Sequence, residues 1–212
     1  MDADAVELRV LGCLIEKQRT TPDQYPLSLN ALRLACNQST NREPVVAYDE
    51  PTIREGLDRL SRRGWVRLAS GRGSRAVKYR HLFDEALSLD DADLSLLAVL
   101  MLRGPQTPAE LRGGTERLHP FADVSSVEAF LAELAERSAE RGGPLVIRLA
   151  RAPGEREARW AHLLSGPVEV APSASRRSES AGGLEEQVAR LLVEVEALRA
   201  EIAELRARFP TT

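Results

Sequence analysis

The 212-residue sequence has few aromatic residues, few cysteines and no long apolar run. Aromatic side chains make up 4% of it and hydrophobic residues as a whole 43%, so a core must be built mainly from Leu, Val and Ala. Both cysteines, Cys13 and Cys36, lie in apolar stretches, which predicts reduced core residues and no disulfide framework. The N-terminus is acidic and unlike a signal peptide, and no run approaches the ~18 apolar residues of a membrane span. We therefore expect a cytoplasmic protein that does not enter a membrane.

Motifs of catalysis and metal binding are also missing. The sequence contains no CxxC, HExxH or GxSxG pattern and no phosphate loop. His81 and His162 occupy equivalent apolar-facing positions of expected strands, which favours core or hairpin residues over ligands. We expect a protein that is not an enzyme and that holds no metal and no other cofactor.

A uniformly basic surface is absent too, since the net charge is −3. The distribution of charge is uneven, and this matters more than the sum. Residues 51–82 hold nine Arg and Lys against two acids, an excess of seven. The corresponding residues 123–163 hold six Arg against seven acids, a balance of −1. One half of the chain is therefore basic and the other is not.

What the sequence does contain is an internal repeat. Residues 65–82 and 146–163 match at an offset of 81 without a gap. Each copy has strand-like residues, a polar turn with glycine and an alternating segment, which predicts a β-hairpin with one buried face. In the first copy the alternation puts Val77, Tyr79 and His81 on one side. It puts Ala76, Lys78 and Arg80 on the other.

Three helices are expected before each hairpin. The third has apolar spacing i, i+4, i+7, with Ile53, Leu57 and Leu60 matched by Val127, Leu131 and Leu134 at an offset of 74. Residues 8–17 and 94–103 are apolar helices, each followed by a Thr-Pro pair (Thr21-Pro22 and Thr107-Pro108) at an offset of 86. Thr107 and Glu110 form a capping box that predicts a helix start. These offsets require the second copy to lack 12 residues before its third helix.

Three helices and a hairpin, twice, predict a mainly α chain with small β-hairpins (α+β). We interpret it as tandem winged helix-turn-helix domains at residues 1–84 and 85–164. Residues 165–183 are rich in Ser, Gly, Pro and Ala and predict a flexible linker.

Residues 184–209 carry an unbroken heptad pattern with β-branched residues at a and Leu at d, which favours a parallel two-stranded coiled coil and a homodimer. The alternative is that the apolar face of this helix packs against the two preceding domains. The expected dimerisation residues are Leu184, Val188, Leu191, Val195, Leu198, Ile202 and Leu205.

The basic stretch is the candidate site for double-stranded DNA. In a winged helix the third helix can enter the major groove while the hairpin reaches the backbone. On the helix, acidic and basic side chains four residues apart, such as Glu55 and Arg59, can form ion pairs in solvent. A solvated helix face is therefore about as well supported as recognition of DNA by this helix. The hairpin is the better case, because its cations have no nearby acid in sequence. The candidate residues are Thr52, Arg54, Arg59, Arg62, Arg63, Arg72, Arg75, Lys78 and Arg80.

Residues 37–49 have no counterpart in the second copy as we align it. They lie where a DNA-binding helix-turn-helix usually has a tight turn, so they form either a plain surface excursion or a recognition element. The candidate loop-surface residues are Asn37, Asn41, Arg42 and Glu43.

The run from Leu14 to Val45, LIEKQRTTPDQYPLSLNALRLACNQSTNREPV, resembles the signature of the bacterial YceH-like family, whose function is unassigned. Residues 107–112, 146–149 and 153–156 look like its second-domain signature. The resemblance covers most of residues 5–166 and implies a tandem winged-helix fold. It implies no catalytic residues, and it marks residues 18–24 and 37–44 as family-like runs that are candidate binding surface.

Two functions remain open. The first is a dimeric DNA-binding protein, a transcriptional regulator that uses its first domain while the second dimerises or binds a protein partner. The alternative is a protein-interaction scaffold built on tandem winged helices and a coiled coil. The excess of seven cations favours DNA, whereas the low overall charge and the self-paired helix face favour the scaffold.

Overall fold

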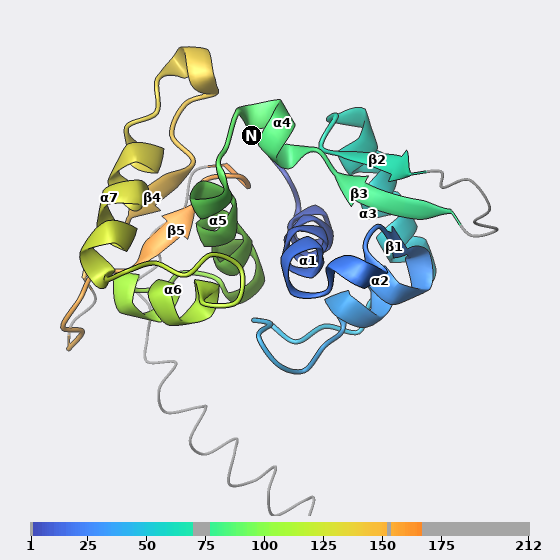
Figure 1. Cartoon of the computed structure of the whole chain (residues 1–212), viewed down its shortest axis with the longest axis horizontal. Helices are drawn as coiled ribbons and strands as arrows, with labels where there is room; N and C mark the ends of the chain where they lie inside the picture. The colour runs from blue at the N-terminus through green and yellow to red at the C-terminus, as the bar shows by residue number, and fades with distance from the viewer. Residues whose placement is uncertain (1, 70–76, 152–153, 167–212) are drawn as a thin grey trace, which may run out of the picture. The chain divides into compact units, whose positions relative to one another are not determined.

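The computed structural model describes residues 2–69, 77–151 and 154–166 (Figure 1). These residues form a mixed α+β structure in which helices are the larger part and the sheets are small and antiparallel. The first half runs α1 (Ala5–Thr20), the short 3-10 helix η1 (Pro22–Gln24), β1 (Leu27–Ser28), α2 (Leu29–Cys36), α3 (Glu50–Arg62), β2 (Val66–Ala69), β3 (Lys78–His81) and α4 (Phe83–Leu87).

The second half repeats the order of three helices and a hairpin. It runs α5 (Asp91–Arg103), α6 (Pro108–Thr115), α7 (Val124–Ala135), the short 3-10 helix η2 (Ala139–Arg141), β4 (Val146–Arg148) and β5 (Trp160–His162). An isolated bridge from Gln106 to Trp160 takes the place that β1 has beside β3. The predicted internal repeat is therefore present in the folded chain.

Side-chain caps determine where the helices begin. Asp4, Ser28, Asp49, Asp90, Thr107 and Asp123 each accept hydrogen bonds from backbone amides of the following first turn. This satisfies donors that a helix otherwise leaves unpaired at its start. The predicted capping box is confirmed, because Thr107 N donates to Glu110 Oε2 at 2.9 Å and Glu110 N donates to Thr107 Oγ1 at 3.2 Å.

The two Thr-Pro pairs, which the repeat aligns at an offset of 86, differ in the structure. Thr21-Pro22 opens only η1, whereas α2 begins at Ser28, which is the structural counterpart of Thr107. Seven of the twelve extra residues of the first copy therefore lie before α2, and five lie between α2 and α3. Residues 37–49 therefore do have a counterpart in the second copy, namely the shorter segment 116–123.

One hydrophobic core runs through both copies. The predicted inward residues of α3 and α7 (Ile53, Leu57, Leu60, Val127, Leu131 and Leu134) are all at most 2% exposed, as expected. Cys13 and Cys36 are buried free thiols in this core, also as expected. No helix among the described residues is long and apolar enough to cross a membrane.

The first helices of the two copies, α1 and α5, pack against each other (Figure 1). Their contact is close at Gly12, where an added Cβ would stand 2.9 Å from Leu102 Cγ and 3.3 Å from Met101 Cβ. Both helices are buried over most of their length. The predicted boundary between residues 84 and 85 falls inside α4, whose Phe83 packs edge-on against Trp65 with ring centroids 5.0 Å apart.

Candidate nucleic-acid interface

The sheet of the first copy, in the order β1-β3-β2, separates apolar from basic residues by its register. Val66 lies opposite His81 and Leu68 opposite Tyr79, which places these four on one face. Arg67 lies opposite Arg80 and Ala69 opposite Lys78, so three cations share the other face. The predicted alternation along β3 is confirmed at these positions.

Val77 departs from the expected pattern. Its side chain is 60% exposed, although the alternation assigns it to the same side as Tyr79 and His81. The last recorded pair of the ladder joins Ala69 and Lys78, so Val77 lies beyond the paired strand. Leu68, opposite Tyr79 on the same face, is also 60% exposed, so the core covers only part of this face.

His81 is a structural residue of this sheet, as its strand position predicted. It is 2% exposed, its Nε2 lies 2.6 Å from Gln18 Oε1, and its Nδ1 lies 3.3 Å from Asp84 Oδ1. Burial lowers its pKa, against the opposing effect of Asp84. Its counterpart His162 is half-buried, and burial lowers the pKa of His162 to about 4.

Two candidate DNA contacts on α3 are used inside the protein. Arg59 Nη2 lies 2.9 Å from Asp4 Oδ2, and Arg63 Nε lies 2.8 Å from Glu7 Oε1. Glu7 is 1% exposed, so its carboxylate requires these cations. Arg59 and Arg63 therefore hold α3 against the start of α1.

These ion pairs were missed because their acids lie more than 50 residues before the arginines. The one available signal was the Asp4-x-x-Glu7 capping pattern before an apolar run, which places a carboxylate at the start of α1. The predicted pair Glu55–Arg59 is present only at 3.9 Å. Arg59 is thus bound mainly to α1.

Thr52 also has a local role. It lies in the first turn of α3, and its backbone N donates to Asp49 Oδ1 at 2.9 Å. Hydrogen bonds from the Thr52 side chain and backbone lower the pKa of Asp49 below its usual value. Thr52 therefore fixes the start of the helix.

The cations that remain available lie on α3 and on the outer face of the hairpin. Arg80 Nη2 lies 3.1 Å from Glu85 Oε1 of α4. Within the described residues no ion pair is recorded for Arg54, Arg62, Arg67 and Lys78. The acids Asp4, Glu7 and Glu85 reduce the excess of seven positive charges to four. Arg72 and Arg75 lie outside the described residues.

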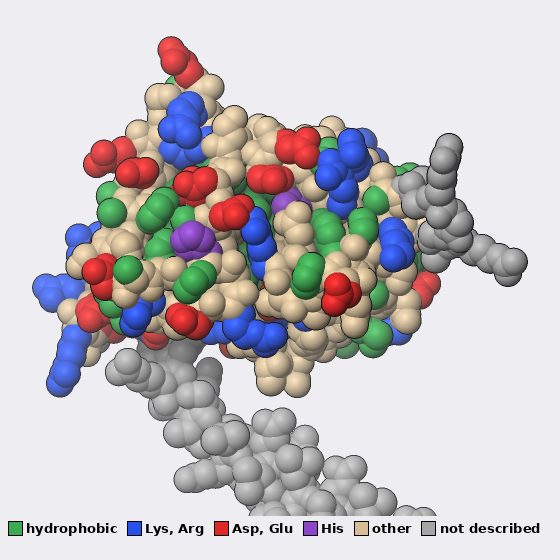
Figure 2. Space-filling model, in the orientation of Figure 1, with side chains coloured by type: hydrophobic (Ala, Val, Ile, Leu, Met, Phe, Trp, Pro, Cys, Tyr) green, Lys and Arg blue, Asp and Glu red, His purple; other side chains and the backbone are tan. Residues whose placement is uncertain are grey.

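Figure 2 shows a mixed surface, in which Lys and Arg side chains alternate with Asp and Glu over the visible face. The uneven charge of the sequence does not become one continuous basic patch on that face. The candidate cations for a nucleic-acid interface are those on the surface of α3 and the hairpin.

Of the candidate loop-surface residues, Arg42 is the clearest correction. It is 4% exposed, and its guanidinium lies 2.6 and 3.1 Å from the two oxygens of Glu16 and 3.1 Å from the carbonyl oxygen of Ala35. Burial alone would raise the pKa of Glu16, but the hydrogen bonds from Arg42 lower it below its usual value. Arg42 anchors the loop to α1 and is not part of the loop's surface.

The rest of the loop is fastened in the same way. Asn37 donates to Tyr48 O at 2.8 Å and accepts from Tyr48 N at 2.9 Å, which closes residues 37–48 into a tied loop. Asn41 accepts from Arg103 of α5. Asn41 and Glu43 are the two candidates that are exposed, and the Glu43 amide is bound to Leu102 O at 2.8 Å.

The hairpin of the second copy has a different register. Val146 lies opposite His162, Ile147 opposite Ala161 and Arg148 opposite Trp160. Relative to the 81-residue match this is a shift of one residue on β4, and such a shift turns side chains to the other face. Arg148, which aligns with Arg67, therefore shares a face with Trp160. The outer basic face of the first hairpin is not repeated.

Among the described residues no three His, Cys, Asp or Glu side chains stand close enough together to hold a metal ion. The predicted dimerisation residues Leu184, Val188, Leu191, Val195, Leu198, Ile202 and Leu205 lie outside the described residues, as does the predicted linker beyond residue 166.

Comparison with known proteins gives a family without an activity. The family described as "Protein of unknown function, DUF480" matches residues 3–155. A "UPF0502 protein" of Dechloromonas aromatica is 52% identical over 202 residues, covering 95% of this chain and 92% of the relative. A "UPF0502 protein" of Delftia acidovorans is 50% identical over 206 residues, covering 97% of this chain and 88% of the relative.

Proposed function

The chain belongs to the DUF480 family of unknown function, in agreement with its resemblance to YceH-like proteins, and we propose that it binds double-stranded DNA through its first copy. In this proposal each copy of three helices and a hairpin is a winged helix, α3 is the recognition helix, and the β2–β3 hairpin is the wing. The protein is then a cytoplasmic transcriptional regulator that acts as a dimer.

The observation that carries this proposal is the pair of like charges on the hairpin. Arg67 and Arg80 are direct cross-strand neighbours, and Lys78 is on the same face. Like charges directly opposite each other destabilise a sheet, so this arrangement costs the fold free energy. The one recorded acid beside them, Glu85, reaches only Arg80. A row of backbone phosphates would satisfy all three cations.

The helix α3 contributes fewer contacts than its composition suggests. Arg54 and Arg62 are exposed and without recorded ion pairs in the described part of the chain, whereas Arg59 and Arg63 are bound to Asp4 and Glu7. Exposed Glu55 and Asp58 on the same helix oppose phosphate. We therefore expect binding dominated by backbone contacts of the hairpin, with weak sequence readout by the helix.

The experiment is a salt titration of DNA affinity with the full chain. Each phosphate contact contributes about 0.9 to the slope of log K against log salt. The double variant Arg67→Ala/Lys78→Ala should therefore bind more weakly at ~50 mM salt and show a slope shallower by up to about 1.8. Its thermal stability should be equal to or above that of the wild type, because the repulsion across the hairpin is relieved.

The matched control is Arg117→Ala/Arg141→Ala, which removes two exposed arginines of the second copy and should leave the slope unchanged. Absence of DNA binding at low salt, or an equal slope in the hairpin variant, would overturn the proposal.

A protein-interaction scaffold is the second candidate, and one observation favours it. Four large apolar side chains of the first copy are 57–60% exposed, namely Leu34, Val45, Leu68 and Val77. Exposed apolar patches mark sites of protein interaction. A pull-down with and without nuclease separates the two functions, since partners that persist after nuclease and are lost in Leu68→Ser/Val77→Ser require the scaffold.

A further inference from the structure

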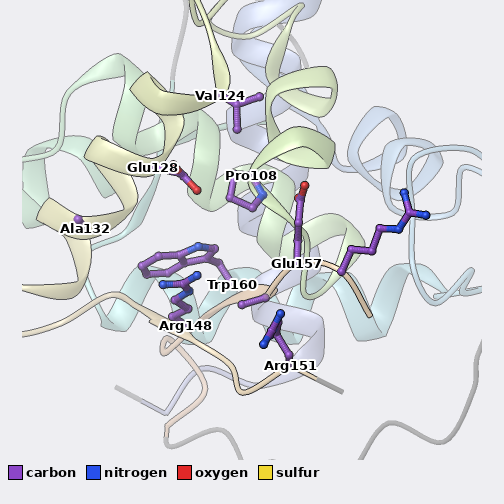
Figure 3. A pocket seen from close by; sticks show the side chains of 10 residues that line it. Pro108, Val124, Glu128, Ala132, Arg148, Arg151, Glu157 and Trp160 are labelled. Carbon is purple, nitrogen blue, oxygen red and sulfur yellow. The ribbon is translucent and has the colours of Figure 1, made fainter. Parts of the chain in front are cut away.

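The second copy contains a pocket that the proposed DNA interface does not use. It has a volume of about 720 Å³ and lies between α7 and the β4–β5 hairpin, beside the start of α6 (Figure 3). Pro108, Val124, Ala132 and Ala158 give it an apolar wall, and Trp160, which is 9% exposed, also lines it. The remaining lining residues are charged. The size is within the ~300–1,000 Å³ of small-molecule sites.

The aromatic surface is held rigidly. Trp160 N donates to Gln106 O at 2.7 Å, and Gln106 N donates to Trp160 O at 3.0 Å. On its other side the strand pairs with β4, where Arg148 is the direct neighbour of Trp160. These hydrogen bonds fix the backbone at Trp160, and burial of the side chain fixes the ring, so little entropy is lost when a ligand packs against it.

Three cations line the same pocket as Trp160. Arg148, Arg151 and Arg156 line the pocket, and none of them has a recorded ion pair within the described residues. Arg159 of the same hairpin behaves differently, because its guanidinium lies 2.7 Å from Glu110 Oε2 and 3.2 Å from Glu155 Oε1. Glu110 and Glu155 are therefore paired with Arg159 and not with the three arginines of the pocket. Glu157 and Glu128 also line the pocket, and neither has a recorded ion pair among the described residues.

The one-residue shift of register on β4 creates this cluster. In the first hairpin Arg67 points to the outer face, but its counterpart Arg148 shares the face of Trp160. Figure 3 shows the Arg148 guanidinium beside the indole ring, with Arg151 on the same side of the pocket and Glu128 of α7 across from them. The site thus combines part of an aromatic ring, three arginines and two carboxylates, Glu128 and Glu157.

We propose that this pocket binds a nucleotide. An aromatic base packs against the exposed part of Trp160, the phosphates bind Arg148, Arg151 and Arg156, and Glu128 accepts hydrogen bonds from sugar hydroxyl or base amino groups. A purely apolar ligand would leave three cations unused, and a simple anion would leave the aromatic surface unused. Both a free nucleotide and a nucleotide within a strand have this chemistry, and the test distinguishes them.

This proposal is independent of the DNA interface of the first copy. The two sites share no residue, and the substitutions that test them differ.

The experiment is isothermal titration calorimetry of the full chain with ATP, adenosine, tripolyphosphate and a single-stranded hexanucleotide. ATP should bind at least tenfold more tightly than adenosine or tripolyphosphate, because each of those fills half of the site. Arg148→Ala/Arg151→Ala should weaken ATP binding at least tenfold. The control Arg54→Ala/Arg62→Ala, which removes two exposed arginines of α3, should leave it unchanged. All four arginines are exposed, so these variants should fold.

Hexanucleotide binding that is lost in Arg148→Ala/Arg151→Ala, without ATP binding, would identify a strand as the source of the nucleotide. The proposal is overturned if neither ligand binds at millimolar concentration, if the pocket variant binds as the wild type does, or if tripolyphosphate alone matches ATP.

Discussion

At the scale of single residues, the arginines of this protein have two distinct roles that their sequence neighbourhood does not reveal. Arg42, Arg59 and Arg63 bind carboxylates of α1, namely Glu16, Asp4 and Glu7. Arginine suits such positions because its planar group makes several directed hydrogen bonds at once. Arg67 and Lys78, in contrast, have no recorded acid among the described residues. The two roles differ only in whether the fold brings a carboxylate close to the cation.

Replacing Arg42 should test its structural role. Arg42→Met leaves Glu16, whose side chain is 13% exposed, without its main partner, so the free energy of unfolding should fall by about 3–5 kcal/mol. Urea denaturation at pH 7 measures this. The double variant Glu16→Leu/Arg42→Met should recover part of the loss, because no charge is then buried alone. A loss below ~1 kcal/mol in the single variant would contradict the role.

His162 should make the protein sensitive to mild acid. Its folded pKa is about 4, below the ordinary ~6.5, because burial disfavours the charged form. Between these values the unfolded chain binds the proton and the folded chain does not, so stability falls as the pH drops from ~6.5 towards 4. His162→Gln should lose less melting temperature than the wild type between pH 7 and pH 4.5. An equal loss in both proteins would exclude His162 as a source of this sensitivity.

At the scale of elements, close helix packing is the feature most open to a direct test. Gly12 of α1 has no room for a side chain, because an added Cβ would stand 2.9 Å from Leu102 Cγ. Gly12→Ala should therefore destabilise the protein by ~1–3 kcal/mol through overpacking, despite the better helix propensity of alanine. Gly113 of α6 has no atom within 4 Å of its added Cβ, so Gly113→Ala should be stabilising by ~0.4–1 kcal/mol. Thermal unfolding of both variants tests this, and the same sign for both would contradict it.

The sequence predicts the elements of this fold better than their connections. The apolar spacing of α3 and α7 was sufficient, because residues at i, i+4 and i+7 on one helical face must be buried together. The aligned Thr21-Pro22 pair does not begin an α-helix as Thr107-Pro108 does, because proline after threonine suits the first turn of a 3-10 helix as well as that of an α-helix. Ser28, six residues after Pro22, carries the true cap.

The candidate site could be predicted only in part, for two physical reasons. Ion pairs across the fold, such as Arg63 with Glu7, join residues 56 positions apart and leave no local pattern. Strand register is set by packing and by the turn, so the aligned Arg67 and Arg148 face opposite ways although their local sequences match. The pocket at Trp160 depends on that register and was missed.

At the scale of the whole molecule, assembly is the main prediction. Residues 184–209 are expected to form a parallel two-stranded coiled coil, so removal of residues 184–212 should shift the solution mass toward that of a monomer. Leu198→Glu should act similarly, because it puts a charge at a d position of the seam. Sedimentation equilibrium measures both. An unchanged dimer in both variants would assign dimerisation to residues 1–183.

The packing of α1 against α5 joins the same helix of two copies of one plan. The copies of this helix are offset by 86 residues, and the position equivalent to Gly12 is Ala98, so the two smallest residue types occupy matching buried sites. The two copies are thus joined through equivalent helices within one hydrophobic core. Severed between residues 84 and 85, the halves should therefore reassociate with each other on mixing.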